Sequence, residues 1–190
     1  IKLSLIQVND ADETYLIDCL SIGDYKNYCS FLFCNNVRKI FHSVREDLEA
    51  IYSWSGERVT NIFDTQLANA FLGGSFSIAY KNLVNENFGI LINKNETRSN
   101  WIRRPLRDSQ LDYAASDVEF LIELYKKQYK ELIQTKKMEW VIEEINYLSN
   151  SIFNQDKEGS IRNSRKISKT EEEKLLSRFN KIIQDISKTN

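Results

Sequence analysis

The sequence is poor in several residue types that mark particular classes of protein. It has one histidine, three cysteines and a net charge of −1 over 190 residues. An odd number of cysteines without metal-type spacing favours free thiols in a reducing compartment, so we expect a cytoplasmic protein. No apolar run approaches the length that crosses a bilayer and there is no secretory signal, so we expect no membrane partner. The balanced total charge does not by itself indicate a polyanionic ligand.

The composition is that of a chain with a core. Hydrophobic residues make up 42% and aromatic residues 12% of the sequence, which is enough for one main domain plus an appendage. The first residue is Ile1 rather than methionine, and the chain starts in a strand-like alternation. We therefore expect a fragment whose natural N-terminal segment is missing.

The order of the apolar patterns predicts an α/β fold with a mixed sheet flanked by helices. Residues 3–8 and 14–17 alternate as two strands of a hairpin, and residues 39–42 and 62–63 read as short buried strands. Helices are expected at residues 25–34, 44–53, 65–72 and 77–88. Glycines follow the last two of these helices and should end them.

Residues 110–132 read as one amphipathic helix around which the rest of the chain is organised. Its apolar positions recur at steps of three and four, and they are Leu111, Ala115, Val118, Ile122, Tyr125, Tyr129 and Leu132. Asp117 lies on neither face; it is one turn after Tyr113 and has apolar neighbours. A carboxylate in such surroundings costs several kcal/mol unless something pairs with it. Either an ion pair or a metal ion would satisfy Asp117, and this helix alone does not decide between them.

Asp47 is a second candidate ligand. It borders the apolar stripe of the helix at residues 44–53, whereas Glu46 and Glu49 face the solvent side. The helix dipole also stabilises an aspartate in the first turn of a helix. For an isolated aspartate, this effect alone would explain its position. Asp47 and Asp117 both lie near the apolar sides of separate helices, and this arrangement favours a shared metal site.

A basic segment precedes the central helix. Between residues 94 and 107 the cations are Lys94, Arg98, Arg103, Arg104 and Arg107, against the single acid Glu96. Trp101 lies among them. Such a segment suits phosphates and a stacked base; the alternative is a solvated loop in which Trp101 anchors the core. Of two further polar residues, we expect His42 to be a buried, hydrogen-bonded residue at a strand end, and Asp64 to cap the helix that follows it.

Four segments together carry a family resemblance: HSVREDLEAI (42–51), IFDTQLANAFLGG (62–74), KNETRSNWIRRPL (94–106) and YAASDVEFL (113–121). In this order they resemble ribonuclease D, a 3′–5′ exoribonuclease of the DEDD superfamily, in the subgroup with a Tyr-x-x-x-Asp motif. The resemblance covers about residues 1 to 135. It implies a ribonuclease H-like 3′–5′ exonuclease fold for that part of the chain.

The resemblance also implies a site. Four carboxylates of the family hold two divalent ions, Mg²⁺ or Mn²⁺; Asp47 matches the second motif, and Tyr113 and Asp117 match the third. The Tyr113 hydroxyl is implied to orient the attacking water, and Lys94 and Arg98 to contact the RNA backbone. The family's first motif, Asp-x-Glu on the opening strand, has no counterpart in this sequence. We therefore expect the first strand to be missing and the chain alone to be inactive.

The implied reaction is hydrolysis of RNA from its 3′ end, as in the trimming of transfer-RNA precursors, with release of nucleoside 5′-monophosphates by a monomeric enzyme. Two alternatives stay open. One is a catalytically inactive RNA-binding fragment of the same fold, and the other is a DNA-directed 3′–5′ exonuclease.

After residue 135 the pattern changes. Residues 137–148 are expected to form a helix, and residues 154–169 a polar linker. A capping box at Thr170 and Glu173 opens another amphipathic helix, which resembles the start of the helical HRDC domain of ribonuclease D. The expected division is therefore an exonuclease domain at 1–135, a connection at 136–168 and the start of a helical domain at 169–190.

Overall fold

The computed structural model describes residues 2–92 and 95–155. Its elements are β1 (Leu5–Asn9), β2 (Thr14–Asp18), α1 (Lys26–Cys29), the 3₁₀ helix η1 (Ser30–Phe33), β3 (Lys39–Phe41), α2 (Arg45–Ser55), β4 (Ile62–Asp64), α3 (Thr65–Phe71), α4 (Tyr80–Phe88), α5 (Asp108–Ser116), α6 (Leu121–Gln134) and α7 (Met138–Gln155). Contacts divide the chain into Ile1–Asn154 and Gln155–Asn190, and the description below concerns the first unit. The expected linker and helical-domain start lie outside the described residues, apart from the end of α7.

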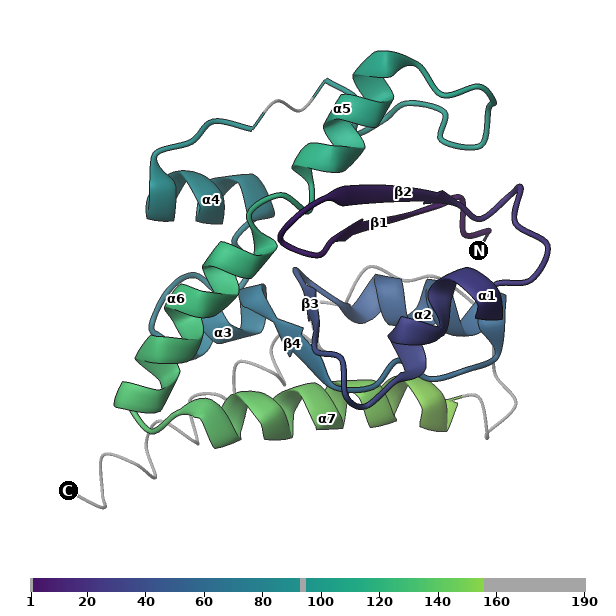
Figure 1. The fold of residues 1–190 in the computed structure, drawn as a ribbon. Helices are drawn as coiled ribbons and strands as arrows, with labels where there is room; N and C mark the ends of the chain where they lie inside the picture. The colour runs from purple at the N-terminus through teal and green to yellow at the C-terminus, as the bar shows by residue number, and fades with distance from the viewer. Residues whose placement is uncertain (1, 93–94, 156–190) are drawn as a thin grey trace. The chain divides into compact units, whose positions relative to one another are not determined.

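The strands form two separate pairs (Figure 1). β1 and β2 are an antiparallel hairpin in which Ile6 lies opposite Ile17, whereas β3 and β4 are parallel, with Ile40 opposite Phe63. Helix α2 makes the crossover between the parallel strands, as such a connection requires. Both strand directions are present, as predicted for a mixed sheet. Within the described residues, however, hydrogen bonds divide that sheet into two.

The main core lies between the hairpin and the helices that follow it. Ile6 of β1 packs in one buried cluster with Leu32 of η1, with Leu48 and Ile51 of α2, and with Ile152 of α7. Lys137, just before α7, donates from Nζ to the Phe71 carbonyl at 2.9 Å. The helix expected at residues 137–148 is thus present but longer, and it packs within the first unit. No described helix is long and apolar enough to cross a membrane.

The prediction of one helix over residues 110–132 was wrong, because the chain breaks between α5 and α6. Ser116 Oγ donates to the Tyr113 carbonyl at 2.7 Å, which competes with the regular backbone pattern. The Phe120 N–H donates instead to the Tyr80 hydroxyl at 3.0 Å. Tyr80 belongs to α4, so a contact distant in sequence satisfies an amide that the break would leave without a partner.

The break also changes which side chains of α6 are buried. Leu124, Gln128 and Leu132 form its buried face. Leu111 and Tyr129, two members of the expected apolar stripe, are 37% and 40% exposed. The expected stripe is therefore wrong at those two positions. The helix expected at residues 25–34 is likewise shorter, since α1 gives way to η1 after one turn.

Candidate active site

The two candidate ligands lie in one cavity although they belong to elements far apart in the sequence. A cavity of about 950 Å³ is lined by Asp47 of α2 and by Asp117 at the end of α5. His42 and Tyr80 line the same cavity, as do residues of β1 and β3. The two sequence-predicted carboxylates therefore share one space.

Asp64 fixes the start of the helix that carries Asp47. This buried carboxylate accepts from the backbone N–H groups of Ser43 at 3.0 Å and Val44 at 2.9 Å. It also accepts from Gln66 N–H at 2.8 Å, so it caps α3 as predicted. Ser43 has a φ of 62°, a conformation that costs free energy for a residue other than glycine. Asp64 stabilises this turn, and the turn starts α2 so that Asp47 reaches the cavity.

Asp47 is accessible from the cavity yet densely surrounded by protein. Desolvation raises its pKa to about 7, with further contributions from the charges of Asp64 and Glu46. None of the ion pairs between described residues includes Asp47. A cation bound in the cavity would lower the pKa of Asp47 again and keep its carboxylate ionised, because a nearby positive charge favours the charged form.

Asp117 lies at the break between α5 and α6, where its backbone N–H still donates to the Tyr113 carbonyl at 3.2 Å. Desolvation raises its pKa to about 6, and hydrogen bonding from the Tyr113 side chain opposes this shift. No described lysine or arginine forms an ion pair with Asp117. The ion-pair alternative for this residue is thus not realised among residues 2–92 and 95–155.

The Tyr113 ring is held from two sides. Its hydroxyl lies 3.2 Å from the Thr97 hydroxyl. The Trp101 ring packs against it with 5.9 Å between the centroids and 44° between the planes. Trp101 is half-buried, so it anchors Tyr113, and its expected contact with a base stays a prediction. Thr97 gave no signal in the sequence.

Fewer cations of the basic segment are free than its sequence predicts. Arg104 makes two hydrogen bonds to the Asp18 carboxylate, at 2.7 and 2.6 Å, and fastens the segment to β2. Arg107 pairs with Glu96 at 2.6 Å. Arg98 and Arg103 are exposed and have no ion pair with a described residue. Lys94, which we expect to contact RNA, lies outside the described residues.

His42 is held by two hydrogen bonds, as expected for a residue at a strand end. Its Nδ1 lies 2.9 Å from Thr65 Oγ1, and its Nε2 lies 2.9 Å from the Ile78 carbonyl. Burial lowers its pKa, and Nε2 donates to Ile78 because a carbonyl oxygen can only accept. With both nitrogens engaged, His42 has a structural role at the cavity wall.

The carboxylates of Asp47 and Asp117 suit a hard divalent cation in type. Mg²⁺ and Mn²⁺ prefer oxygen ligands, and both acids lack a cationic partner among the described residues. Two acids are nevertheless few: no group of three or more His, Cys, Asp or Glu that could hold a metal exists in the described part of the chain. Asp47 and Asp117 therefore fit part of a metal site.

Replacing Asp117 by Asn should stabilise the metal-free protein near neutral pH. The pKa of Asp117 is raised in the folded state, so the unfolded chain releases its proton at lower pH and the free energy of unfolding falls as pH rises from about 4 through about 6. Asparagine has no proton to release. We expect a gain in Tm of about 2–4 °C at pH 7.5 that shrinks toward pH 4, measured by thermal unfolding with a chelator. Asp112→Asn, an exposed change on the same helix, is the control; an equal gain there would exclude relief of a buried charge.

The fold is that of a known class of nuclease. A family model described as 3′-5′ exonuclease matches residues 1–133, which is more than half of the chain. The chain therefore belongs to the 3′–5′ exonuclease family.

Its relatives are ribonucleases D. The ribonuclease D of Shewanella sp. (strain ANA-3) is 37% identical over 143 residues, 75% of this chain and 37% of that protein. The ribonuclease D of Haemophilus influenzae is 40% identical over 134 residues, 70% of this chain and 34% of that protein. The resemblance carried by the four sequence segments is thus confirmed.

A solved structure agrees with this assignment. The crystal structure of Escherichia coli RNase D, described as an exoribonuclease involved in structured RNA processing, matches with a TM-score of 0.76 and 31% identity, over 78% of this chain and 40% of that one. The predicted ribonuclease H-like exonuclease fold is therefore confirmed. The chain spans between about a third and two fifths of the length of these relatives.

Proposed function

We propose that this chain is the catalytic part of a metal-dependent 3′–5′ exoribonuclease that trims RNA 3′ ends, with transfer-RNA precursors as substrates. The observation that carries the proposal is the pair Asp47 and Asp117, two carboxylates with raised pKa that share one cavity and lack a cationic partner among the described residues. Paired acids of this kind occur where a cation is bound in a working enzyme. We also propose a cytoplasmic monomer that releases nucleoside 5′-monophosphates.

In this proposal each residue of the site has a separate role. Asp47 and Asp117 hold the divalent ions, Mg²⁺ or Mn²⁺, which would activate the attacking water and stabilise the leaving 3′-oxygen. Tyr113, beside Asp117 and steadied by Thr97 and Trp101, orients that water through its hydroxyl. A bound cation would lower the pKa of Asp47, so that its carboxylate stays ionised at lower pH.

The chain alone should show little or no nuclease activity. No group of three or more possible metal ligands exists among the described residues, and the strands at residues 5–9 and 14–18 carry no Asp-x-Glu that could match the family's first motif. A version that includes an Asp-x-Glu strand should shorten a 3′-extended RNA in Mn²⁺, and the same version with Asp117→Ala controls for contaminating nuclease. Robust trimming by residues 1–190, abolished by Asp117→Ala, would contradict the need for further ligands. Absence of trimming by the version with the added strand would favour the inactive RNA-binding alternative.

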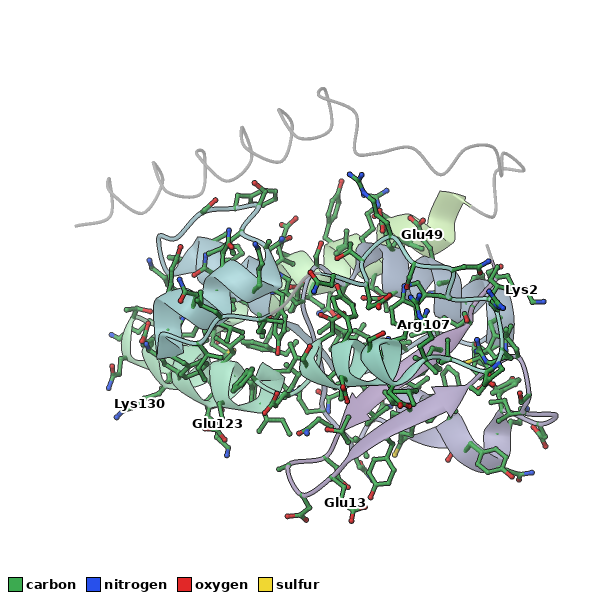
Figure 2. The ribbon with its side chains drawn as sticks, turned by 90° about the horizontal axis from the view of Figure 1, so that it is seen from above. Lys2, Glu13, Glu49, Arg107, Glu123 and Lys130 are labelled. Atoms are coloured by element: carbon green, nitrogen blue, oxygen red, sulfur yellow. The ribbon has the colours of Figure 1, made fainter. Side chains whose placement is uncertain are left out.

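Cations of the basic segment should contact the RNA backbone. Replacing Lys94 and Arg98 together by Ala should weaken binding of single-stranded RNA and reduce the slope of log K against log salt by about 1.4, since each phosphate contact contributes about 0.7. Fluorescence anisotropy over a salt series measures both quantities. Lys127 and Lys130 of α6 provide a matched control, because Lys130 projects outward from α6, away from Arg107 (Figure 2). An unchanged slope in the Lys94 and Arg98 variant would show that the segment is only solvated.

A further inference from the structure

One tyrosine, Tyr80 of α4, contacts both chain segments that lead to the candidate ligands. Its hydroxyl accepts the Phe120 N–H at 3.0 Å, three residues after Asp117. Its ring lies against the ring of His42, with 5.6 Å between the centroids and 62° between the planes, and His42 precedes Asp47 by five residues. Tyr80 therefore contacts a residue close in sequence to each acid, and it does so from a third element of the fold.

The amide of Phe120 lies in a part of the break where helical hydrogen bonding is irregular. The Val118 N–H donates to the Ala115 carbonyl and the Leu121 N–H donates to the Val118 carbonyl, each at 3.3 Å. Both bonds span three residues instead of four and are longer than usual, which makes them weaker than the bonds of a regular helix. Between these two amides, the Phe120 N–H bonds to Tyr80. The position of the turn after α5 therefore depends on this tertiary contact.

The Tyr80 ring is itself held by two sets of contacts. The first is with His42, whose ring nitrogens lie 2.9 Å from Thr65 Oγ1 and 2.9 Å from the Ile78 carbonyl. In the second, Tyr80 and Phe120 pack against a buried apolar cluster, which consists of Ile78, Leu83, Val84 and Leu124. A phenol held in this way presents its oxygen at a defined place, so it can set the position of an amide that donates to it.

The contact with His42 connects Tyr80 to the start of α2. The two residues after His42 donate their N–H groups to the buried carboxylate of Asp64. Helix α2 starts directly after them and has Asp47 in its first turn, so hydrogen bonds fix the chain that leads from His42 to Asp47. Tyr80 thus contacts a fixed point near Asp47 and holds the turn after Asp117.

Asp117 is sensitive to small movements of this turn, because it is the C-terminal cap of α5 and lies at the break itself. Mg²⁺ requires near-ideal coordination geometry, and a site loses function when its ligands are held too loosely. Burial raises the pKa of the Tyr80 hydroxyl above its ordinary value. The phenol is therefore neutral near pH 7 and serves as a hydrogen-bonding group, not as an anionic ligand.

We propose that Tyr80 is a positioning residue that sets the distance between Asp47 and Asp117 by holding the Phe120 amide. This role rests on the proposed function, because it concerns the same metal site. Tyr80 acts through Asp117 and contacts neither the metal nor the RNA. Tyr80→Phe keeps the ring and its packing and leaves both acids in place, so it should loosen the turn without removing a ligand.

The first test uses the metal-free protein of residues 1–190. Tyr80→Phe should speed amide hydrogen exchange at Phe120 by about tenfold or more, because this amide loses its acceptor. Tyr25→Phe is the matched control, since it removes another phenol hydroxyl with a main-chain partner, the Ser55 carbonyl at 2.9 Å, at the opposite end of α2 from Asp47. Unchanged exchange at Phe120 in Tyr80→Phe, or an equal increase in Tyr25→Phe, overturns the proposal.

The second test measures the metal site, in a version of the protein that includes an Asp-x-Glu strand. Tyr80→Phe should lower the affinity for Mn²⁺ in calorimetry by about tenfold, as is typical when a group that supports a metal ligand is lost. The single-turnover rate at limiting Mn²⁺ should fall by a similar factor. Excess Mn²⁺ should restore the rate to within about threefold of the parent, because both carboxylates remain charged.

A double-mutant cycle tests whether Tyr80 acts through Asp117. In the Asp117→Asn background, Tyr80→Phe should change the residual Mn²⁺ affinity by less than about twofold, because the ligand that Tyr80 positions is already lost. A fall of about tenfold in both backgrounds would show that the two effects are independent, and it would overturn the proposal.

Tyr25→Phe is again the control for a general loss of stability, which would not change the Mn²⁺ affinity of the folded protein. A fall in affinity of the same size in Tyr25→Phe overturns the role of Tyr80. So does a loss of rate in Tyr80→Phe that excess Mn²⁺ does not restore, which would place the hydroxyl in the chemical step. Absence of Mn²⁺ binding by the parent version overturns the proposed function itself, whereas binding by the parent that Tyr80→Phe leaves unchanged overturns only the role of Tyr80.

Discussion

Asp117→Asn, in a version of the protein that includes an Asp-x-Glu strand, is expected to abolish turnover while the fold is kept. The change preserves the size and shape of the side chain at the break between α5 and α6. It removes the negative charge that a hard dication requires. A neutral amide also cannot regain charge when metal is added, so excess Mn²⁺ should not restore the activity.

Single-turnover rates on a 3′-extended RNA and Mn²⁺ titration by calorimetry measure this effect. Both turnover and Mn²⁺ affinity should fall in Asp117→Asn, and neither should change in Asp112→Asn on the same helix. Near-normal turnover in Asp117→Asn would make Asp117 an ordinary carboxylate at a helix end and would refute the proposed site.

Tyr113→Phe should lower the single-turnover rate by about 10²–10³-fold, as expected when one oriented polar group is lost at a transition state. The ring and its packing against Trp101 are retained, and only the hydroxyl beside Thr97 is lost. Mn²⁺ affinity should survive, because Asp117 is unchanged. Comparison of Asp117→Asn with Tyr113→Phe thereby distinguishes a metal ligand from a residue that positions the water.

Two controls accompany the Tyr113 variant. Tyr129→Phe removes the hydroxyl of an exposed residue of α6 and should leave the rate unchanged. Thr97→Val keeps the Tyr113 hydroxyl and removes its 3.2 Å neighbour, so it tests whether Thr97 matters through the orientation of Tyr113. A Tyr113→Phe rate within about threefold of the parent would show that the hydroxyl does not position the water.

Local patterns were sufficient for much of the fold. The hairpin and the β3–α2–β4 passage follow from residue alternation and from helical periodicity, which are local properties. The two candidate ligands were also found locally, because Asp47 borders the apolar stripe of its helix and Asp117 lies on neither face of the helix that was expected at residues 110–132. The patterns of the separate helices do not show that Asp47 and Asp117 face one cavity, because this depends on the tertiary fold.

The features that sequence reasoning missed depend on contacts between distant residues. The break between α5 and α6 uses the hydroxyl of Tyr80, forty residues before the amide that it satisfies. The attachment of the basic segment uses the pair of Arg104 with Asp18, eighty-six residues apart. Neither partner departs from its local pattern, so no periodicity could reveal the pairing.

The division of the sheet has a different cause. Strand patterns predict which residues are extended, but not whether an edge is paired. Each of β1 and β3 has a partner on one side within the described residues, and no ladder joins β1 to β3 among them. The sequence therefore predicts which residues form strands, but not how many sheets these strands form.

Product analysis tests the central claim most directly. A 5′-labelled RNA with a 3′ extension is incubated in Mg²⁺ with the version that includes the Asp-x-Glu strand, and both the shortened RNA and the released nucleotides are identified. The proposed function predicts a ladder that shortens from the 3′ end, with nucleoside 5′-monophosphates released, and no ladder in Asp117→Asn or with a chelator. Internal cuts, products ending in 3′-phosphate, or equal shortening by Asp117→Asn would contradict it.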